Sequence, residues 1–174
     1  EVSGSSLSHN KGTNRFRWNM RHSGSWDKDP KKAFLNGPLV APGKYVAQLN
    51  IEGNTYTNKF QILMDPNVKK SGIRISNVKA QEKLALQVRS LLDESKIMAH
   101  KLKDVEDGPM LIIKEALVTN EGPYPQPMLI DQARYLGSML DRSDQQPGVD
   151  AYSRFEELNE QFESLKKSYN QLND

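Results

Sequence analysis

The residues of this chain that could act as acids, bases or metal ligands are its histidines and carboxylates, and they are not spaced like a site. His9, His22 and His100 lie far apart, and none has a second ligand at the short spacing of a metal site. The adjacent carboxylates Glu156 and Glu157 are typical of a solvated helix face. The chain has no cysteine, no glycine-rich phosphate loop, no nucleophile elbow and no HExxH motif. The sequence therefore predicts no catalytic residue, no metal site and no cofactor.

Two aromatic residues in expected loops are the candidate ligand-binding residues. Trp26 lies in a polar loop, 23–32, and Tyr124 lies in a connection rich in proline and glycine, 119–127. A ring exposed in a loop can stack on a sugar or anchor a protein interface. The alternative interpretation is that the rings pack against neighbouring strands and have a structural role only.

A run of arginines near the N-terminal end raises the question of a nucleic-acid partner. Arg15, Arg17 and Arg21 are interleaved with Phe16 and Trp18. In a strand, this alternation puts the arginines and the rings on opposite faces. Since base stacking and phosphate contact would then need different surfaces, we expect no nucleic-acid partner.

The part of the chain that has to position these residues falls into a strand-rich and a helix-rich half. In the first half, alternating side chains predict a strand over 13–21, and a further strand is considered near Leu39. Residues 44–51 and 55–64 predict a hairpin around the turn at 52–54.

The second half is predicted to be mostly helical. Residues 77–103 carry an apolar stripe at helical spacing, with Ser95 at its one polar position. The stripe consists of Leu84, Val88, Leu91, Met98 and Leu102. Residues from about 149 to 172 repeat the pattern through Phe155, Leu158, Phe162, Leu165, Tyr169 and Leu172. We expect these two stripes to form the main seam of nearly antiparallel helices. Residues 110–118 fit a short helix better than a buried strand, and residues 128–140 fit a helix.

The expected fold class is α+β with two domains. Residues 1–70 would form a small immunoglobulin-like antiparallel β-sandwich, complete or lacking strands, and residues 71–174 an antiparallel helical hairpin or a bundle of three or four helices. Because so few strands hardly cover their own apolar faces, we expect strands upstream of Glu1 to complete the sandwich. The chain begins without methionine or signal peptide, which also favours a piece of a longer parent protein.

Charge and hydropathy give further limits. The chain has 24 basic and 22 acidic residues, and this balance does not indicate nucleic acid or an acidic membrane as a partner. No run approaches the roughly 18 apolar residues that a membrane span needs. The first 70 residues hold 11 basic and 5 acidic residues and the remainder 13 and 17, which fits two modules with different surfaces.

Three segments resemble one family of large bacterial secreted proteins. Residues 12–21 (GTNRFRWNMR) are similar to the family's strand G-x-N-R-hydrophobic-x-W-D-L-R, with Asn19 and Met20 in place of Asp and Leu. Residues 37–45 (GPLVAPGKY) are similar to its G-P-x-V-x-P-G-x-Y segment. Residues 135–148 (YLGSMLDRSDQQPG) are similar to its final hairpin, Y-L-hydrophobic-G-x-V-x-x-A-D-x-x-P-T. These proteins carry sortilin-like, BNR-type β-propellers and are often labelled glycosyl hydrolases.

The resemblance extends from about Gly12 to the end of the chain. Asp65-Pro66 matches the D-P-R that ends the family's immunoglobulin-like domain, although Asn67 replaces the Arg, and Gly148 stands where Thr is usual. The resemblance implies a non-catalytic C-terminal structural or interaction region of a secreted, periplasmic or cell-surface bacterial protein. Such a region would brace the upstream β-propeller or dock a protein partner.

Two other functions stay open. The chain could be part of a glycoside hydrolase whose catalytic residues lie outside it. It could instead be a carbohydrate-binding module that uses Trp26, with a glycan as its partner.

Overall fold

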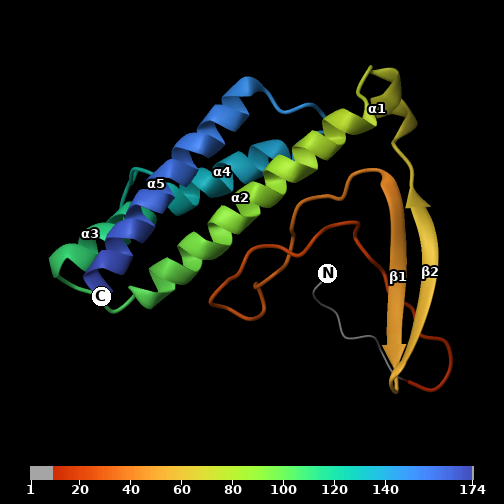
Figure 1. Ribbon diagram of the computed structural model, residues 1–174, viewed down its shortest axis with the longest axis horizontal. Coiled ribbons are helices and arrows are strands. Elements are labelled where there is room, and N and C mark those ends of the chain that lie inside the picture. Colours follow the sequence, from red (N-terminus) through yellow and green to blue (C-terminus); the bar gives the residue numbers. More distant parts are fainter. Residues whose placement is uncertain (1–9, 174) are drawn as a thin grey trace.

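The computed structural model describes residues 10–173. His9 and the expected junction upstream of Glu1 lie outside this range. The chain is α+β, with a two-stranded antiparallel sheet beside a group of helices (Figure 1). The elements are β1 (Gly43–Ile51), β2 (Asn54–Ile62), α1 (Pro66–Lys70), α2 (Ile75–Lys101), α3 (Gly108–Leu117), α4 (Leu129–Leu140) and α5 (Val149–Asn173). The predicted boundary between 1–70 and 71–174 falls directly after α1.

The β1–β2 hairpin confirms the predicted pair of strands. The register places Leu49 opposite Tyr56, so the apolar side chains of both strands share one face. Glu52 and Gly53 join the strands with φ values of 48° and 82°. Positive φ at both central residues is the signature of a type I′ turn, whose twist matches that of the flanking strands.

The strands expected over 13–21 and near Leu39 are not formed. A single isolated bridge joins Arg21 to Leu39, and a φ of 58° at Met20 interrupts the extended backbone. Phe16 and Met20, which would share one face of that strand, are about half exposed. The described residues therefore form a two-stranded sheet, and they do not form a full immunoglobulin-like sandwich.

The predicted helices are confirmed, with small changes at their ends. Residues 110–118, for which the sequence favours a short helix over a buried strand, lie almost entirely in α3. α3 begins with Gly108 and Pro109, because proline is well accommodated in the first turn of a helix. In the first turn of α2, the side chain of Asn77 accepts the backbone N–H of Arg74 at 2.8 Å.

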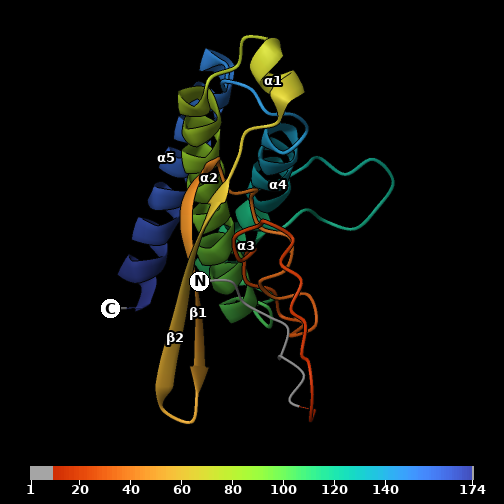
Figure 2. The same ribbon diagram turned by 90° about the vertical axis from the view of Figure 1, so that its right-hand side faces the viewer.

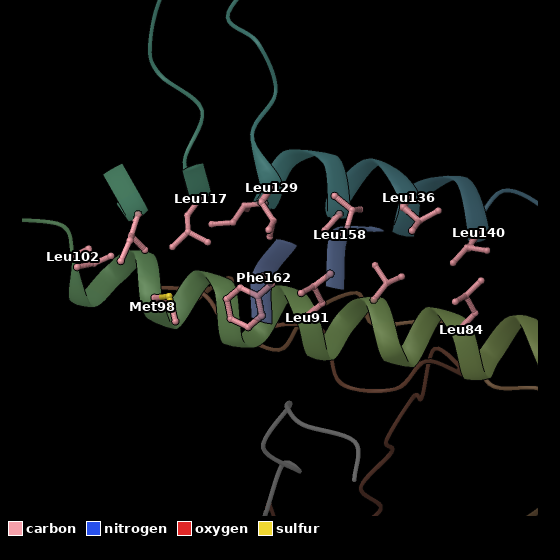
Figure 3. Packing of buried hydrophobic residues seen from close by; sticks show 14 residues of the cluster. Leu84, Leu91, Met98, Leu102, Leu117, Leu129, Leu136, Leu140, Leu158 and Phe162 are labelled. Carbon is pink, nitrogen blue, oxygen red and sulfur yellow. The ribbon is translucent and has the colours of Figure 1, made fainter. Parts of the chain in front are cut away.

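One hydrophobic core joins α2, α3, α4 and α5 (Figure 3). The predicted stripe on α2 is buried, including Ser95, which is fully enclosed. Of the predicted α5 stripe, only Leu158 and Phe162 are fully buried, whereas Leu172 is about half exposed. The buried cluster consists of Leu84, Val88, Leu91, Met98, Leu102, Ile113, Leu117, Leu129, Ile130, Ala133, Leu136, Leu140, Leu158 and Phe162.

The helix directions correct the predicted seam. α2 and α5 run in the same direction, as both views of the ribbon show (Figures 1 and 2). α4 runs opposite to α2 and packs against it more extensively than α5 does. The antiparallel seam therefore lies between α2 and α4. The chain turns back after α4, so α5 runs parallel to α2. The sequence stripes predicted which faces are buried but not which helix each face meets.

Candidate functional site

An irregular segment, residues 20–42, folds back on itself and lies against α2 and α4; we call it the strap. The backbone N–H of His22 donates to the carbonyl of Pro38 at 2.9 Å, and that of Gly24 donates to Phe34 at 2.8 Å. These bonds satisfy backbone groups that would otherwise lack hydrogen-bond partners where the strap approaches the helices.

Two glycines let the two sides of the strap approach each other. A Cβ on Gly24 would lie 1.8 Å from the carbonyl oxygen of Leu35, and a Cβ on Gly37 would lie 2.3 Å from that of His22. No side chain fits at these distances, so the strap needs glycine at both positions.

Polar side chains fix the strap to the helices. Oε1 of Glu82 on α2 lies 2.7 Å from Nε2 of His22 and accepts the backbone N–H of Ala41 at 3.1 Å. The guanidinium of Arg21 donates two bonds, of 2.9 and 3.0 Å, to the carboxylate of Asp141, which follows α4. Such a two-bond pair fixes orientation as well as distance.

Lys96 forms the anchor farthest along α2. Its Nζ donates to Ser25 Oγ and to the Trp26 carbonyl, both at 3.0 Å, and lies 3.5 Å from Asp27 Oδ2. The pKa of Asp27 is lowered mainly because its carboxylate accepts the backbone N–H of Asp29, and in addition because Lys96 is close. One ammonium group thus holds three consecutive residues of the strap.

Lys96→Ala is expected to lower the free energy of unfolding by about 2 kcal/mol, because hydrogen bonds to a charged donor are lost from a site that is mostly buried. Chemical denaturation measures the loss, and faster amide exchange at Gly24 would show that the strap opens. Lys83→Ala, on an exposed face of the same helix, is the control and should have little effect. Equal losses in the two variants would contradict an anchoring role for Lys96.

Trp26, one of the two candidate ligand-binding residues, belongs to the strap and packs against α2. Its backbone N–H donates to the Asp93 carboxylate, and its ring centre is 5.3 Å from that of His100, tilted by 54°. The side chain is partly buried. In the alternative, structural interpretation, the ring of Trp26 is expected to pack against neighbouring strands. In the structure it contacts the helix α2 instead.

Tyr124, the other candidate, lies in the loop that projects from the bundle between α3 and α4 (Figure 2). Its side chain is fully exposed and its φ is 55°. The loop is closed at its base, where Thr119 Oγ1 accepts the Met128 backbone N–H at 2.9 Å. Because a fully exposed ring touches no neighbour, the structure does not bring Tyr124 and Trp26 together into one platform.

Within residues 10–173, the contacts that cover the apolar face of the hairpin lie at its base. Trp18 packs edge-on against Tyr45 and Phe60, with ring centres 5.9 and 6.1 Å apart. Burial raises the pKa of Tyr45, and the charge of Glu82 adds to this effect. Beyond this aromatic cluster, towards the turn, the apolar side chains are open to solvent.

Two hollows of the described part of the chain lie on α2. One, of about 530 Å³, lies between the strap, α2 and α4, and arginine side chains line it. The other, of about 510 Å³, is an open groove between α2 and α5, lined by Leu86, Phe155 and charged residues.

Sequence reasoning missed the residues of α2 that hold the strap. Glu82, Arg89, Asp93 and Lys96 follow one another at helical spacing and form a polar stripe beside the apolar one. Every one of them bonds a strap residue. A second stripe of this kind is the signal that could have indicated a polar partner for that face.

The described residues show no arrangement typical of a metal site. Within residues 10–173, no three His, Asp or Glu side chains gather closely enough to hold a metal ion. In the same range, no helix combines the length and hydropathy needed to cross a bilayer.

Comparison with known proteins gave no relative. No protein-family model, no curated protein and no solved structure matches the chain. The resemblance to propeller-bearing proteins therefore stays a prediction.

Proposed function

We propose that this chain is a non-catalytic interaction region of a larger secreted or surface bacterial β-propeller protein, and that its β1–β2 hairpin docks onto the upstream part of that parent. The observation that carries the proposal is the uncovered apolar face of the hairpin. Leu49, Ile51 and Tyr56 lie on this face and are 39%, 49% and 59% exposed. No helix packs against either strand within the described residues.

A hairpin of this kind is incomplete as a folding unit. An isolated pair of strands is marginal in water, and a third strand or a covering element is normally needed. In the described part of the chain, β1 and β2 pair only with each other, so each presents one edge with free N–H and C=O groups. Added strands would satisfy those groups and bury the apolar face at the same time.

Strands from the parent protein are the occupant that best accounts for this surface. The resemblance in 12–21 and 37–45 is to segments of an immunoglobulin-like module that follows a propeller. In the parent protein, strands that precede this chain would complete that module. The strap and the helices then form a rigid base for the hairpin, because several polar anchors fix the strap to α2 and α4.

The test compares amide exchange of the hairpin in this chain and in the parent protein. We expect amides between Leu49 and Tyr56 to exchange at least about tenfold more slowly in the parent, because docking there would contribute more than about 1.4 kcal/mol. Leu49→Lys should remove this protection, because it places a charge on the apolar face. Gln48→Lys, one residue away on the polar face, is the matched control and should keep it.

Equal exchange in the two proteins would contradict the proposal. So would a parent coding sequence without a propeller, recognisable by its repeated Asp-box motifs. Hydrolysis of a sugar substrate by this chain alone would overturn the non-catalytic role, and glycan binding abolished by Trp26→Ala would favour a carbohydrate-binding module instead.

A further inference from the structure

The cavity of about 530 Å³ between the strap, α2 and α4 combines an apolar wall with charged groups at its rim. Its apolar lining comes from three elements and includes Leu39, Val78, Val88, Leu92 and Leu140. Its volume lies in the range of small-molecule sites, and concave sites of this type bind ligands through apolar contact plus a few polar groups.

Arg89 is the cavity residue with a buried side-chain N–H that no described residue accepts. Its Nη1 donates one long bond, of 3.4 Å, to the carbonyl of Ser23. Its Nε is buried, and no described residue accepts its proton. The edge formed by Nε and Nη2 carries two parallel N–H groups, which is the geometry that binds a carboxylate through two bonds.

The other charged groups around the cavity leave this edge unsatisfied. The Glu82 carboxylate is occupied by His22 and Ala41, and the Asp141 carboxylate by Arg21. Arg134 pairs with Asp131. The remaining lining charges, those of Arg142 and Asp144, are on exposed residues.

With these, the lining holds four guanidinium groups, of Arg21, Arg89, Arg134 and Arg142, against three carboxylates, of Glu82, Asp141 and Asp144. Because Asp131 balances Arg134, these charges cancel, and it is the buried, unpaired N–H of Arg89 in an apolar wall that favours an anion over water alone.

We propose that this cavity binds a small organic carboxylate with an apolar body. The carboxylate accepts from the Nε and Nη2 edge of Arg89, and the apolar body lies along Val88 and Leu92. Because Nε is closed off from solvent in this structure, binding requires a local shift of the strap against α2. This site is separate from the hairpin face and does not depend on a parent protein or on docking.

The test uses 3-phenylpropionate as the probe and 3-phenylpropanamide as its neutral counterpart. In arginine-resolved NMR spectra of the wild-type chain, the Nε–Hε signal of Arg89 should shift with 3-phenylpropionate and not with the amide. Arg89→Lys keeps the charge but removes the two-donor edge, and it should weaken binding roughly 10- to 100-fold. Arg154→Lys, on the exposed face of α5, is the control and should change binding less than about twofold.

Several results would overturn the proposal. Equal binding of the amide would show an apolar pocket without carboxylate recognition. An equal shift with inorganic phosphate would show a bare anion site in which the apolar wall plays no part. An unchanged Arg89 signal at saturating probe would place any binding elsewhere, and this measurement holds even where Arg89→Lys fails to fold, because it uses the wild-type chain.

Discussion

Phe162→Ala is expected to lower the free energy of unfolding by about 3–5 kcal/mol. The ring is 2% exposed and projects from α5 towards α2 between Leu91 and Met98 (Figure 3). Its loss removes a large apolar surface and leaves a cavity that the surrounding helices fill only in part. Leu91→Ala, on the facing helix, should cost about 2–5 kcal/mol for the same reason. Chemical denaturation, monitored by far-UV circular dichroism, measures both values.

Leu172→Ala is the matched control for Phe162→Ala. Both residues belong to the same predicted stripe of α5, but Leu172 is 47% exposed. Its truncation should cost well under about 1 kcal/mol, because little apolar surface returns to water. Similar losses for Phe162→Ala and Leu172→Ala, or no loss for Phe162→Ala, would contradict the packing of α5 against α2.

The contrast between these two residues shows how far the sequence could predict the fold. Helical spacing identifies the face of α5 that prefers burial, because the 3.6-residue period is a local property. It does not show where the partner helix ends. α2 and α5 run parallel, and Tyr169 still packs against the core, whereas Leu172, the last member of the stripe, lies outside it.

The strand predicted over 13–21 failed for a related reason. Alternation favours an extended conformation only where a neighbouring strand accepts the backbone hydrogen bonds. The strap instead pairs with itself, and Met20 turns the chain with a positive φ. The hairpin prediction succeeded because its turn and both strands are adjacent in the sequence, so local signals were sufficient.

The candidate site was less predictable than the fold. Trp26 stood out as an aromatic residue in a polar loop, but its contacts with Asp93 and His100 join segments about 70 residues apart. Arg89 carried no signal of its own, because an arginine on a helix is usually a solvated surface residue. Its significance comes from the strap and α4, which form a cavity beside it, and from its buried Nε, from which no described residue accepts.

Gln81 is a second polar residue that the apolar pattern hides. It extends the stripe of α2 backwards at the same spacing and is 8% exposed. Its side chain spans the connection from α4 to α5: Nε2 donates to the carbonyls of Leu140 and Ser143, and Oε1 accepts the Gln145 backbone N–H at 3.0 Å. One amide thus satisfies backbone groups at the end of α4 that have no partner within the helix.

Gln81→Met is therefore expected to lower the free energy of unfolding by about 2–4 kcal/mol, although methionine has a similar length and is more apolar. The reason is that the variant leaves backbone groups near α4 without partners in a partly buried place. Gln87→Met, at an exposed position of the same helix, is the control and should have little effect or stabilise slightly. Denaturation gives the two values, and faster amide exchange at Gln145 would locate the loss in the α4–α5 connection. A Gln81→Met variant as stable as the wild-type chain would mean that water replaces the amide at little cost, and that apolar contact with α4 alone holds this end of the bundle together.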